Sequence, residues 1–346
     1  MKISFCKYSL ELKHQFTIAY SSRKTTPIVL IKIEHNGIAG YGEASLPPYL
    51  SETQESVIYF LTEVAKKKYQ DICNLQNNLD EIDSIAPYNI AAKAAIDIAL
   101  HDLTGKLNHL PCYKLFNIAN EFLPFTSFTI GIDEPEIMRK KIGEAEQFKI
   151  IKVKLGREHD RDMIRLIRSE TDKPLFVDVN QGWTDNQYAL EMSHWLQEQN
   201  VLLIEQPFSK EDLKSSEWLS ERSPIPIFAD ESVQRISDLE NIQRAFNGIN
   251  IKLMKCTGIN EAYKMILKAR ELGFKIMLGC MTETSCAISA AIQLASLVDY
   301  ADLDGNILIA NDPFEARTVI DGQLQLSQKD GLGIELIKDL SFIDLC

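Results

Sequence analysis

The sequence predicts an α/β protein in which an eight-stranded parallel barrel of the TIM type is joined to a smaller α+β domain. Three observations predict this fold. The length of 346 residues suggests about two domains. Between residues 125 and 303, eight short β-rich runs alternate with helical stretches, and eight parallel strands can close into a barrel. The residues before and after this region have a different texture of hairpins, helices and turns.

The N-terminal third is predicted to contain strands followed by helices. Polar and apolar residues alternate over Lys2–Phe16 and Pro27–His35, which indicates two strands. An Asn-Gly pair follows the second run and favours a hairpin turn. Helices are expected over Ser51–Lys68 and Asn89–Lys106, and the second carries a broad apolar stripe.

Two features of this third invite a functional interpretation that we do not favour. Gly37, Gly40 and Gly42 have the spacing of a phosphate-binding loop, but they do not open a helix, so turn chemistry is the preferred interpretation. His101 and Asp102 are neighbours on the second helix. We interpret this pair as structural rather than catalytic.

The eight predicted barrel strands follow one another at intervals of one strand–helix unit. They cover Phe125–Ile132, Ile150–Leu155, Leu175–Asn180, Val201–Gln206, Ile225–Ala229, Ile249–Met254, Lys275–Gly279 and Tyr300–Leu303. The region is shorter than the ~250 residues typical of a TIM barrel, so we expect the last helix to be missing. Turn-and-strand texture resumes after Pro313 and is expected to return to the N-terminal domain. The predicted boundaries are 1–122 for the capping domain, 123–311 for the barrel and 312–346 for the returning tail.

The composition argues against several classes of partner. The 49 acidic residues outnumber the 37 basic ones, and the formal net charge of −12 disfavours nucleic acid and anionic membranes. The N-terminus lacks the apolar core of a signal peptide, and no stretch approaches the ~18 apolar residues of a membrane span. The seven scattered cysteines form no CxxC pair, which favours reduced thiols. We therefore expect a cytoplasmic protein.

Acidic residues stand at the ends of three successive predicted strands. They are Asp178 in VDVNQGW, Glu205 in IEQP and Asp230 in ADES. Because the C-terminal ends of barrel strands meet at one face, the three carboxylates are expected to converge. Uncompensated carboxylates would repel one another, and their oxygens are ligands of hard divalent cations, so Mg²⁺ is the predicted occupant. Their common register disfavours the alternative of three unrelated strand-end caps or ion-pair partners.

Lysines stand on the strands on either side of this trio. Lys154 ends the preceding strand, and Lys252 lies on the following one. A substrate carboxylate bound to the metal would lie between these two lysines, which would face opposite sides of its α-carbon. Crowding by the metal and by the other lysine is expected to lower both pKa values, so that each can act as a base. This arrangement suits removal of a proton α to a carboxylate, with the metal stabilising the enolate.

The set of strand-end motifs resembles that of the enolase superfamily, specifically its muconate-lactonizing subgroup. The motifs are K-x-K at 152–154, VDVNQGW, IEQP, ADES and IKLMK. The resemblance covers essentially the whole chain. It implies a modified (β/α)7β TIM-type barrel with an α+β capping domain built from the N-terminal third and the C-terminal tail.

The same resemblance implies roles for the strand-end residues. Asp178, Glu205 and Asp230 would be the Mg²⁺ ligands. Lys154 and Lys252 would be the two acid/base catalysts, with Lys154 serving the R configuration of the substrate and Lys252 the S configuration.

The ADLDG segment distinguishes between members of this subgroup. Its Asp302 and Asp304 resemble the Asp-x-Asp pair of dipeptide epimerases, which binds the α-ammonium group of the substrate. Residues two apart on an extended strand lie on the same side, so two carboxylates there would suit a cation. The alternative is a solvated acidic turn. We therefore expect a Mg²⁺-dependent dipeptide epimerase that inverts the α-carbon of the second residue by 1,1-proton transfer, acting on L-Ala-L/D-Glu.

Further contacts to the substrate follow from the resemblance. Thr129 resembles the family's substrate-contacting threonine, and Lys152 would help to bind the substrate carboxylate. Cys280 aligns with a position that lines the dipeptide site, although a small buried residue is an equally good interpretation. The loop 19–26 is expected to fold over the barrel mouth, where Arg23 or Lys24 would pair with an acidic side chain on the second residue.

Other functions remain open at this point. N-acylamino-acid racemase, o-succinylbenzoate synthase and cycloisomerase use the same scaffold, and the aspartate pair argues against them. A non-catalytic metal-binding barrel is disfavoured by the two opposed lysines. A metal-dependent hydrolase would need histidine ligands and a nucleophile that the site lacks. The resemblance also implies that the chain forms a homo-oligomer. The small molecule that it binds would be a dipeptide substrate.

Overall fold

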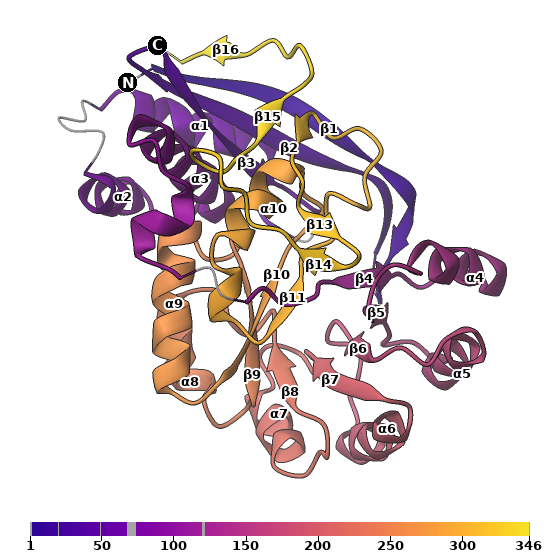
Figure 1. Ribbon diagram of the computed structural model, residues 1–346. Helices are drawn as coiled ribbons and strands as arrows, with labels where there is room; N and C mark the ends of the chain where they lie inside the picture. Colours follow the sequence, from indigo (N-terminus) through magenta and orange to yellow (C-terminus); the bar gives the residue numbers. More distant parts are fainter. Residues whose placement is uncertain (1, 20, 49, 68–73, 120–121, 346) are drawn as a thin grey trace.

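The computed structural model describes residues 2–19, 21–48, 50–67, 74–119 and 122–345. Its centre is a parallel sheet of eight strands: β4 (Ser127–Ile130), β5 (Ile150–Lys154), β6 (Leu175–Asp178), β7 (Val201–Glu205), β8 (Ile227–Ala229), β9 (Gly248–Lys252), β10 (Lys275–Gly279) and β11 (Tyr300–Asp302). The strands lie in sequence order from β4 to β11. A parallel bridge between Thr126 and Ala301 joins the two edges and closes the sheet into a barrel. The predicted TIM-type barrel is confirmed (Figure 1).

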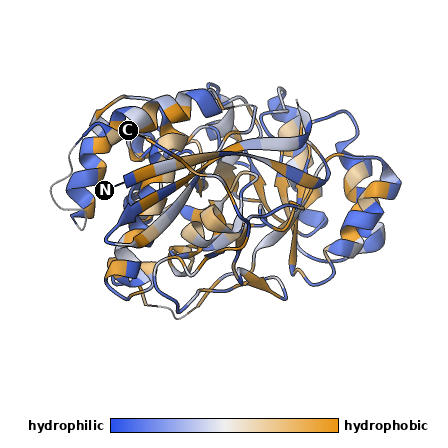
Figure 2. Cartoon of the chain, turned by 90° about the horizontal axis from the view of Figure 1, so that it is seen from above, coloured by the Kyte–Doolittle hydropathy of each residue, from blue (hydrophilic) through white to orange (hydrophobic). Residues whose placement is uncertain are grey.

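Helices connect the barrel strands and cover the outside of the barrel (Figure 1). They are α4 (Pro135–Glu144), α5 (Asp160–Glu170), α6 (Asn186–Glu198), α7 (Leu213–Ser220), α8 (Leu239–Ile242), α9 (Ile259–Glu271) and α10 (Ser285–Ile292), with short 3₁₀ turns η2 (Ile236–Asp238) and η3 (Ala295–Leu297). Figure 2 shows hydrophobic and hydrophilic residues mixed along the outer helices, as expected where one face is buried, whereas α10 is buried over its whole length. Residues 303–345 form no helix, so the last barrel helix is missing as predicted.

The strand period of two builds the inside of the barrel in layers. Phe176, Leu203, Phe228 and Met277 form a buried apolar cluster that is packed against Tyr300. Two residues further along three of these strands stand the buried carboxylates of the predicted metal site, at 178, 205 and 230. An apolar floor therefore lies beneath a polar layer at the C-terminal end of the barrel.

An antiparallel sheet and three helices form the cap over this end. The sheet has the order β16-β1-β2-β3, with β1 (Lys2–Thr17), β2 (Ser22–His35), β3 (Ile38–Ser45) and β16 (Ile343–Asp344). The helices are α1 (Gln54–Ala65), α2 (Leu75–Ser84) and α3 (Ile90–Leu107), followed by the 3₁₀ turn η1 (Cys112–Phe116). Asn36 and Gly37 have φ of 49° and 79°, as the predicted hairpin turn requires. Helix α2, which has few apolar residues, was not predicted from the sequence.

Two glycines of this cap have a role that differs from the predicted one. Gly40 and Gly42 lie within β3 rather than in a turn. A Cβ atom at either position would collide with the backbone of α3, at Ala99 and Ala95 respectively. Both glycines therefore allow close packing of the helix on the sheet, and the turn interpretation is wrong for them.

The C-terminal tail returns to the cap, as predicted. It contains β12 (Phe314–Glu315), β13 (Val319–Ile320), β14 (Gln323–Leu324) and β15 (Glu335–Leu336) before β16 pairs with β1. The boundaries at residues 122 and 311 stay predictions. The expected loop over 19–26 is mostly strand, because β2 already begins at Ser22; Tyr20 lies outside the described residues.

In the described part of the chain, no helix has the length and apolarity needed to cross a membrane. The thiols of Cys6, Cys112, Cys256, Cys280 and Cys286 are free. Cys73, Cys346 and the predicted helix end at Lys68 lie outside the described residues.

Candidate active site

A cavity of about 430 Å³ lies between the C-terminal ends of the barrel strands and the cap. Most of the predicted site residues line it: Arg23, Thr129, Lys152, Lys154, Asp230, Lys252, Cys280, Asp302 and Asp304. Asp178 and Glu205 are fully buried beside Asp230. Lys24 is exposed and is not among the lining residues.

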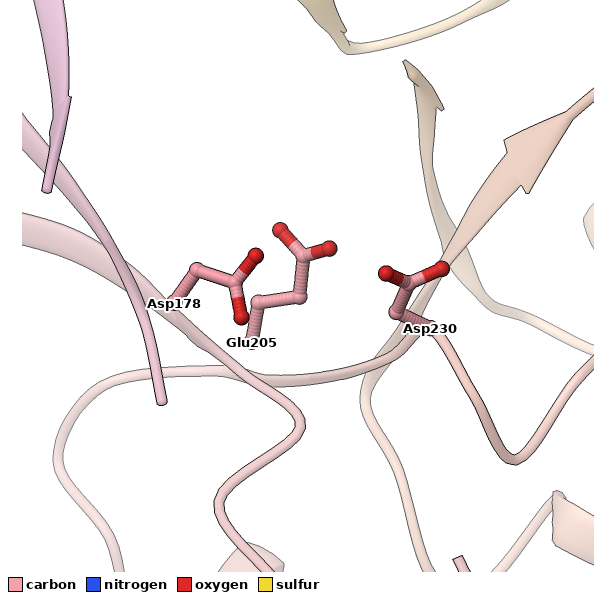
Figure 3. Close-up of side chains that lie close together, drawn as sticks. All are labelled: Asp178, Glu205 and Asp230. Carbon is pink, nitrogen blue, oxygen red and sulfur yellow. The ribbon is translucent and has the colours of Figure 1, made fainter. Parts of the chain in front are cut away.

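The three predicted metal ligands converge. Asp178, Glu205 and Asp230 each offer a carboxylate oxygen, and these oxygens lie within 4.8 Å of one another. Figure 3 shows the three carboxyl groups turned toward a common space. Strand register explains the convergence, since Asp178 pairs with Glu205 across β6 and β7, and Asp230 directly follows β8.

A lysine lies beside each outer carboxylate of this triad. Lys154, paired in register with Asp178, donates to its Oδ2 at 2.5 Å. Lys252 donates to Asp230 Oδ2 at 2.6 Å. Both lysines are buried, with 7% and 6% of their surface exposed, so their ammonium groups are held at the wall of the cavity. The two lysines therefore stand on opposite sides of the triad, on β5 and β9.

Lys152 contacts more carboxylates than either of these lysines. Its Nζ lies 2.7 Å from Asp302 and from Glu205, and 3.2 Å from Asp178. Burial alone would lower the pKa of Lys152, but these three carboxylates outweigh burial and hold it well above 10.5. Lys152 is therefore a fixed cation in the wall of the cavity, linking the triad to the end of β11.

The electrostatics of the triad are uneven. Burial alone would raise the pKa of Asp178 and of Asp230, but neighbouring lysines outweigh it and hold the pKa of Asp178 below 3.8 and that of Asp230 well below 3.8. Burial and repulsion from Asp178 raise the pKa of Glu205 to about 7. Glu205 is thus the carboxylate of the triad that the lysines compensate least, and a divalent cation beside it would favour its charged form.

The aspartate pair at the end of β11 is held by residues of β4, the neighbouring strand where the barrel closes. Ser127 Oγ donates to Asp302 Oδ1 at 2.7 Å, and the backbone N–H of Thr129 donates to Asp304 Oδ2 at 2.6 Å. Lys152 holds the other oxygen of Asp302. Burial and repulsion from Asp302 raise the pKa of Asp304 to about 7. A cation beside Asp304 would stabilise its charged form.

On the cap side, Arg23 reaches into the cavity from β2. Its Nε donates to Thr26 Oγ1 at 3.1 Å, and its Nη2 donates to Thr282 Oγ1 at 3.0 Å. The guanidinium lies over the Phe16 ring, 5.1 Å from its centroid. Cys280 lies across the cavity wall, and its Sγ donates to the Asp302 carbonyl at 3.3 Å. Burial, reinforced by nearby carboxylates, raises the pKa of this thiol well above 9.0.

Several residues that support the site were not assigned a role from the sequence. Lys255 donates to the carboxylate of Asp230 and, at 2.5 Å, to its carbonyl. Asn250 Nδ2 donates to Glu205 Oε1 at 2.8 Å. Gln206 Oε1 accepts from the Asp230 N–H at 2.9 Å. Asn250 stands two residues before Lys252, so the strand period could have placed it inside the barrel.

The backbone at the ends of β6 and β7 takes an unusual conformation. Asn180, Gln181 and Gln206 have φ of 47°, 65° and 40°, in the left-handed region that side chains other than glycine seldom adopt. Such strain commonly concentrates at functional sites, where surrounding contacts hold it in place. Here it turns the chain sharply just after Asp178 and Glu205.

Comparison with known families agrees with this geometry. Residues 138–340 match the enolase C-terminal domain-like family, and residues 4–116 match the N-terminal domain of mandelate racemase / muconate lactonizing enzyme. The chain belongs to the enolase superfamily. The resemblance predicted from the strand-end motifs is confirmed.

Individual relatives within the superfamily extend over nearly the whole chain. An L-Ala-D/L-Glu epimerase of Bacteroides thetaiotaomicron is 54% identical over 96% of this chain and 88% of its own length. A dipeptide epimerase of Cytophaga hutchinsonii, in complex with Mg and D-Ala-L-Val, superimposes with a TM-score of 0.92 at 28% identity, covering 100% and 99% of the two chains. An N-succinyl Arg/Lys racemase of Bacillus cereus gives 0.90 at 29% identity, covering 97% and 95%.

The donor set fits the kind of ion that one of these superfamily structures contains. Three convergent carboxylates are hard oxygen ligands, which suit Mg²⁺ better than a softer metal. A cavity with two opposed lysines beside such a site can move a proton to and from a carbon that lies between them.

Proposed function

We propose that this protein is a Mg²⁺-dependent dipeptide epimerase that inverts the α-carbon of the second residue by 1,1-proton transfer. The observation that carries the proposal is the pair of buried lysines, Lys154 and Lys252, on opposite sides of the carboxylate triad. The 54% identity to an L-Ala-D/L-Glu epimerase supports Ala-Glu dipeptides as the preferred substrate.

In this proposal Asp178, Glu205 and Asp230 would hold the Mg²⁺. When bound, Mg²⁺ stabilises the negative charge that collects on the substrate carboxylate as the α-proton leaves. Lys152, whose Nζ lies 2.7 Å from Glu205, would also bind the substrate carboxylate.

The two lysines would exchange a proton with opposite faces of the α-carbon. Lys154 in its neutral form removes the proton from one configuration, while Lys252 as an ammonium returns a proton on the opposite face. The roles reverse for the other configuration. Because each Nζ already donates to a carboxylate of the triad, its position is fixed before the substrate enters.

The substrate's α-ammonium group would bind at the end of β11, to Asp304 and Asp302. Asp304 is the better placed acceptor, since both oxygens of Asp302 already receive hydrogen bonds from Ser127 and Lys152. Thr129, whose N–H fixes Asp304, would contact the substrate here.

The acidic side chain of the second residue would extend toward the cap. Arg23 is the cation that lines the cavity on that side, and Thr26 and Thr282 hold its guanidinium. Lys24, predicted as an alternative cation, is exposed and would act only from the rim. Cys280 would form part of the wall beside the peptide.

The deciding experiment is exchange of the substrate α-proton in D₂O with Mg²⁺, read by mass spectrometry over a small library. The library contains L-Ala-L-Glu, hydrophobic and cationic dipeptides, and N-succinyl amino acids. We expect deuterium to enter the second residue of L-Ala-L-Glu most rapidly, and a chelator to abolish the exchange. Exchange confined to the N-succinyl compounds would instead support the racemase alternative, which the Bacillus cereus neighbour keeps in view.

The lysines are tested by Lys154→Met and Lys252→Met. Loss of one acid/base group costs typically 10²–10⁴-fold, so we expect epimerisation to disappear in both variants. Each variant is expected to keep α-proton exchange with solvent for one substrate configuration, the one whose α-proton faces the remaining lysine. Full epimerase activity in both variants would refute the assignment.

We also propose that the protein works in the cytoplasm as a homo-oligomer. Free buried thiols at Cys6, Cys112, Cys256 and Cys286 suit a reducing compartment. Light scattering on the purified protein would test the assembly, and a monomer at micromolar concentration would contradict it.

A further inference from the structure

Among the side chains that line the cavity, two buried oxygen atoms beside the carboxylate triad accept no hydrogen bond from the residues that the structure describes. They are Asn180 Oδ1 and Glu231 Oε2. Both side chains line the cavity. A buried acceptor without a donor is destabilising, so such a pair at a functional site indicates that another group binds there.

The two side chains are tied to the triad and to each other. The N–H of Asn180 donates to Asp178 Oδ1 at 3.0 Å, and Glu231 directly follows Asp230 in the chain. Asn180 Nδ2 lies 3.5 Å from Glu231 Oε1, at the limit of a hydrogen bond. The pair therefore bridges the ends of β6 and β8, on either side of the strand that carries Glu205.

The occupant must donate two hydrogen bonds at the metal side of the cavity. The substrate's ammonium group does not suit this place, because its proposed site lies at the end of β11, three strands from β6 and three from β8 in the closed barrel. Lys255 does not suit it either, since its Nζ donates to Asp230 and Asn250. Mg²⁺ usually keeps several waters, and a water polarised by Mg²⁺ is a strong donor with two protons.

We propose that Asn180 and Glu231 together hold one water of the Mg²⁺ coordination sphere, and so act as positioning residues for the metal. The inference rests on the metal part of the proposed function and not on the identity of the dipeptide. Partners of this kind orient the groups that bind the metal directly, and their loss typically weakens metal affinity 10–100-fold.

The test is Mg²⁺ binding by isothermal titration calorimetry, without substrate, on protein stripped with a chelator. We expect Asn180→Ala and Glu231→Ala each to raise the Mg²⁺ Kd about tenfold. Because both residues hold the same water, the double variant should bind about as weakly as the weaker single variant, rather than about a hundredfold more weakly than the wild type. Glu231→Gln, which keeps an acceptor, should lie between the wild type and Glu231→Ala.

The matched control is Gln181→Ala. Gln181 is the neighbour of Asn180, lines the same cavity and has the same left-handed backbone, so alanine carries a similar conformational cost at both positions. Its Oε1 already accepts from the Lys210 N–H at 3.0 Å. We expect its Mg²⁺ Kd to stay within twofold of the wild-type value.

Four results would overturn the inference. Additive losses in the double variant would mean that the two residues act independently, through charge or fold. An unchanged Mg²⁺ Kd with a raised dipeptide KM at saturating Mg²⁺ would make them substrate contacts. Failure of the wild-type protein to bind Mg²⁺ would refute this inference and the metal part of the proposed function. Equal Mg²⁺ affinity in the wild type and the variants would refute this inference alone.

Discussion

Buried carboxylates occur in two neighbouring regions of this protein, and their partners differ. At the metal-binding end of the cavity, lysines donate to Asp178 and Asp230. The second region is the cap–barrel seam, where Glu43 and Ser45 of β3 contact residues 282–284 after β10. There Glu43 accepts hydrogen bonds from the N–H and hydroxyl of Thr284.

The pKa values follow these partners. At the metal-binding end, lysines outweigh burial and lower the pKa of both aspartates. At the seam, burial and repulsion from Glu283 raise the pKa of Glu43 to about 8, and burial raises the pKa of Glu283 to about 7. Lysines therefore keep the two aspartates of the triad charged, whereas the pKa of Glu205, which lies between them, is raised like those of the seam acids. Glu43, where the cap meets the barrel, is a largely neutral acid.

The largest effect is expected at the metal-binding end. Asp230→Asn removes the charge of one of the three proposed ligands, the carboxylate that pairs with Lys252 and Lys255. A bound metal contributes several kcal/mol to charge stabilisation, so α-proton exchange should fall about 10³-fold or more. Mg²⁺ titration and deuterium exchange measure the two losses.

Glu283→Gln is the matched change at the seam. This acid is also fully buried, but its Oε1 accepts from the Met281 N–H rather than from a lysine. We expect a far smaller loss of exchange than in Asp230→Asn. Equal losses would break the contrast between the two regions.

A smaller effect is expected at the ammonium site. Asp304→Asn should lower kcat/KM for dipeptides by roughly 10–100-fold, because a hydrogen bond to a charged group is worth about 1.5–3 kcal/mol. N-succinyl amino acids, which lack the ammonium group, serve as the control substrate and should lose little. A uniform loss over both substrate classes would mean that Asp304 supports the barrel rather than the ligand.

The cap end is tested by side-chain preference. Arg23→Met should reduce the kcat/KM ratio of L-Ala-L-Glu over L-Ala-L-Val by about tenfold or more, since the guanidinium would pair with the glutamate side chain. Lys24→Met offers the comparison, because Lys24 is exposed and does not line the cavity. A larger drop in Lys24→Met than in Arg23→Met would assign the recognition to the rim instead.

The sequence could predict the metal-binding end because the barrel imposes regular rules. Side chains alternate along a strand, and the C-terminal ends of barrel strands meet at one face. These two rules were enough to predict that Asp178, Glu205 and Asp230 lie close together. Lys154 and Lys252 followed from the same rules, and their contacts to the triad agree with them.

The seam could not be predicted in the same way. Glu43 and Thr284 lie 241 residues apart, and their contact depends on how the cap docks. No periodicity links the two segments. The contact between Arg23 and Thr282 has the same character, and for the same reason the sequence could not choose between Arg23 and Lys24. Contacts between docked surfaces depend on the shape of both domains, whereas the positions of strand-end residues can be predicted from the sequence pattern.

The smallest expected effect concerns stability, and it tests the neutral acid at the seam. Glu43 has a pKa of about 8 in the folded protein and about 4.5 in the unfolded chain, so below pH 4.5 it is protonated in both states and its titration does not change the free energy of unfolding. As the pH rises from 4.5 to 8, the unfolded chain releases this proton while the folded protein keeps it, so stability falls. Glu43→Gln removes this titration, and the Tm of the wild type should therefore drop relative to that of the variant between pH 5 and pH 8. Thermal unfolding at several pH values measures the difference, with exposed Glu55→Gln as the control. Parallel Tm curves for wild type and Glu43→Gln would mean that Glu43 is ionised at neutral pH, and that the seam holds its charge as the metal-binding end does.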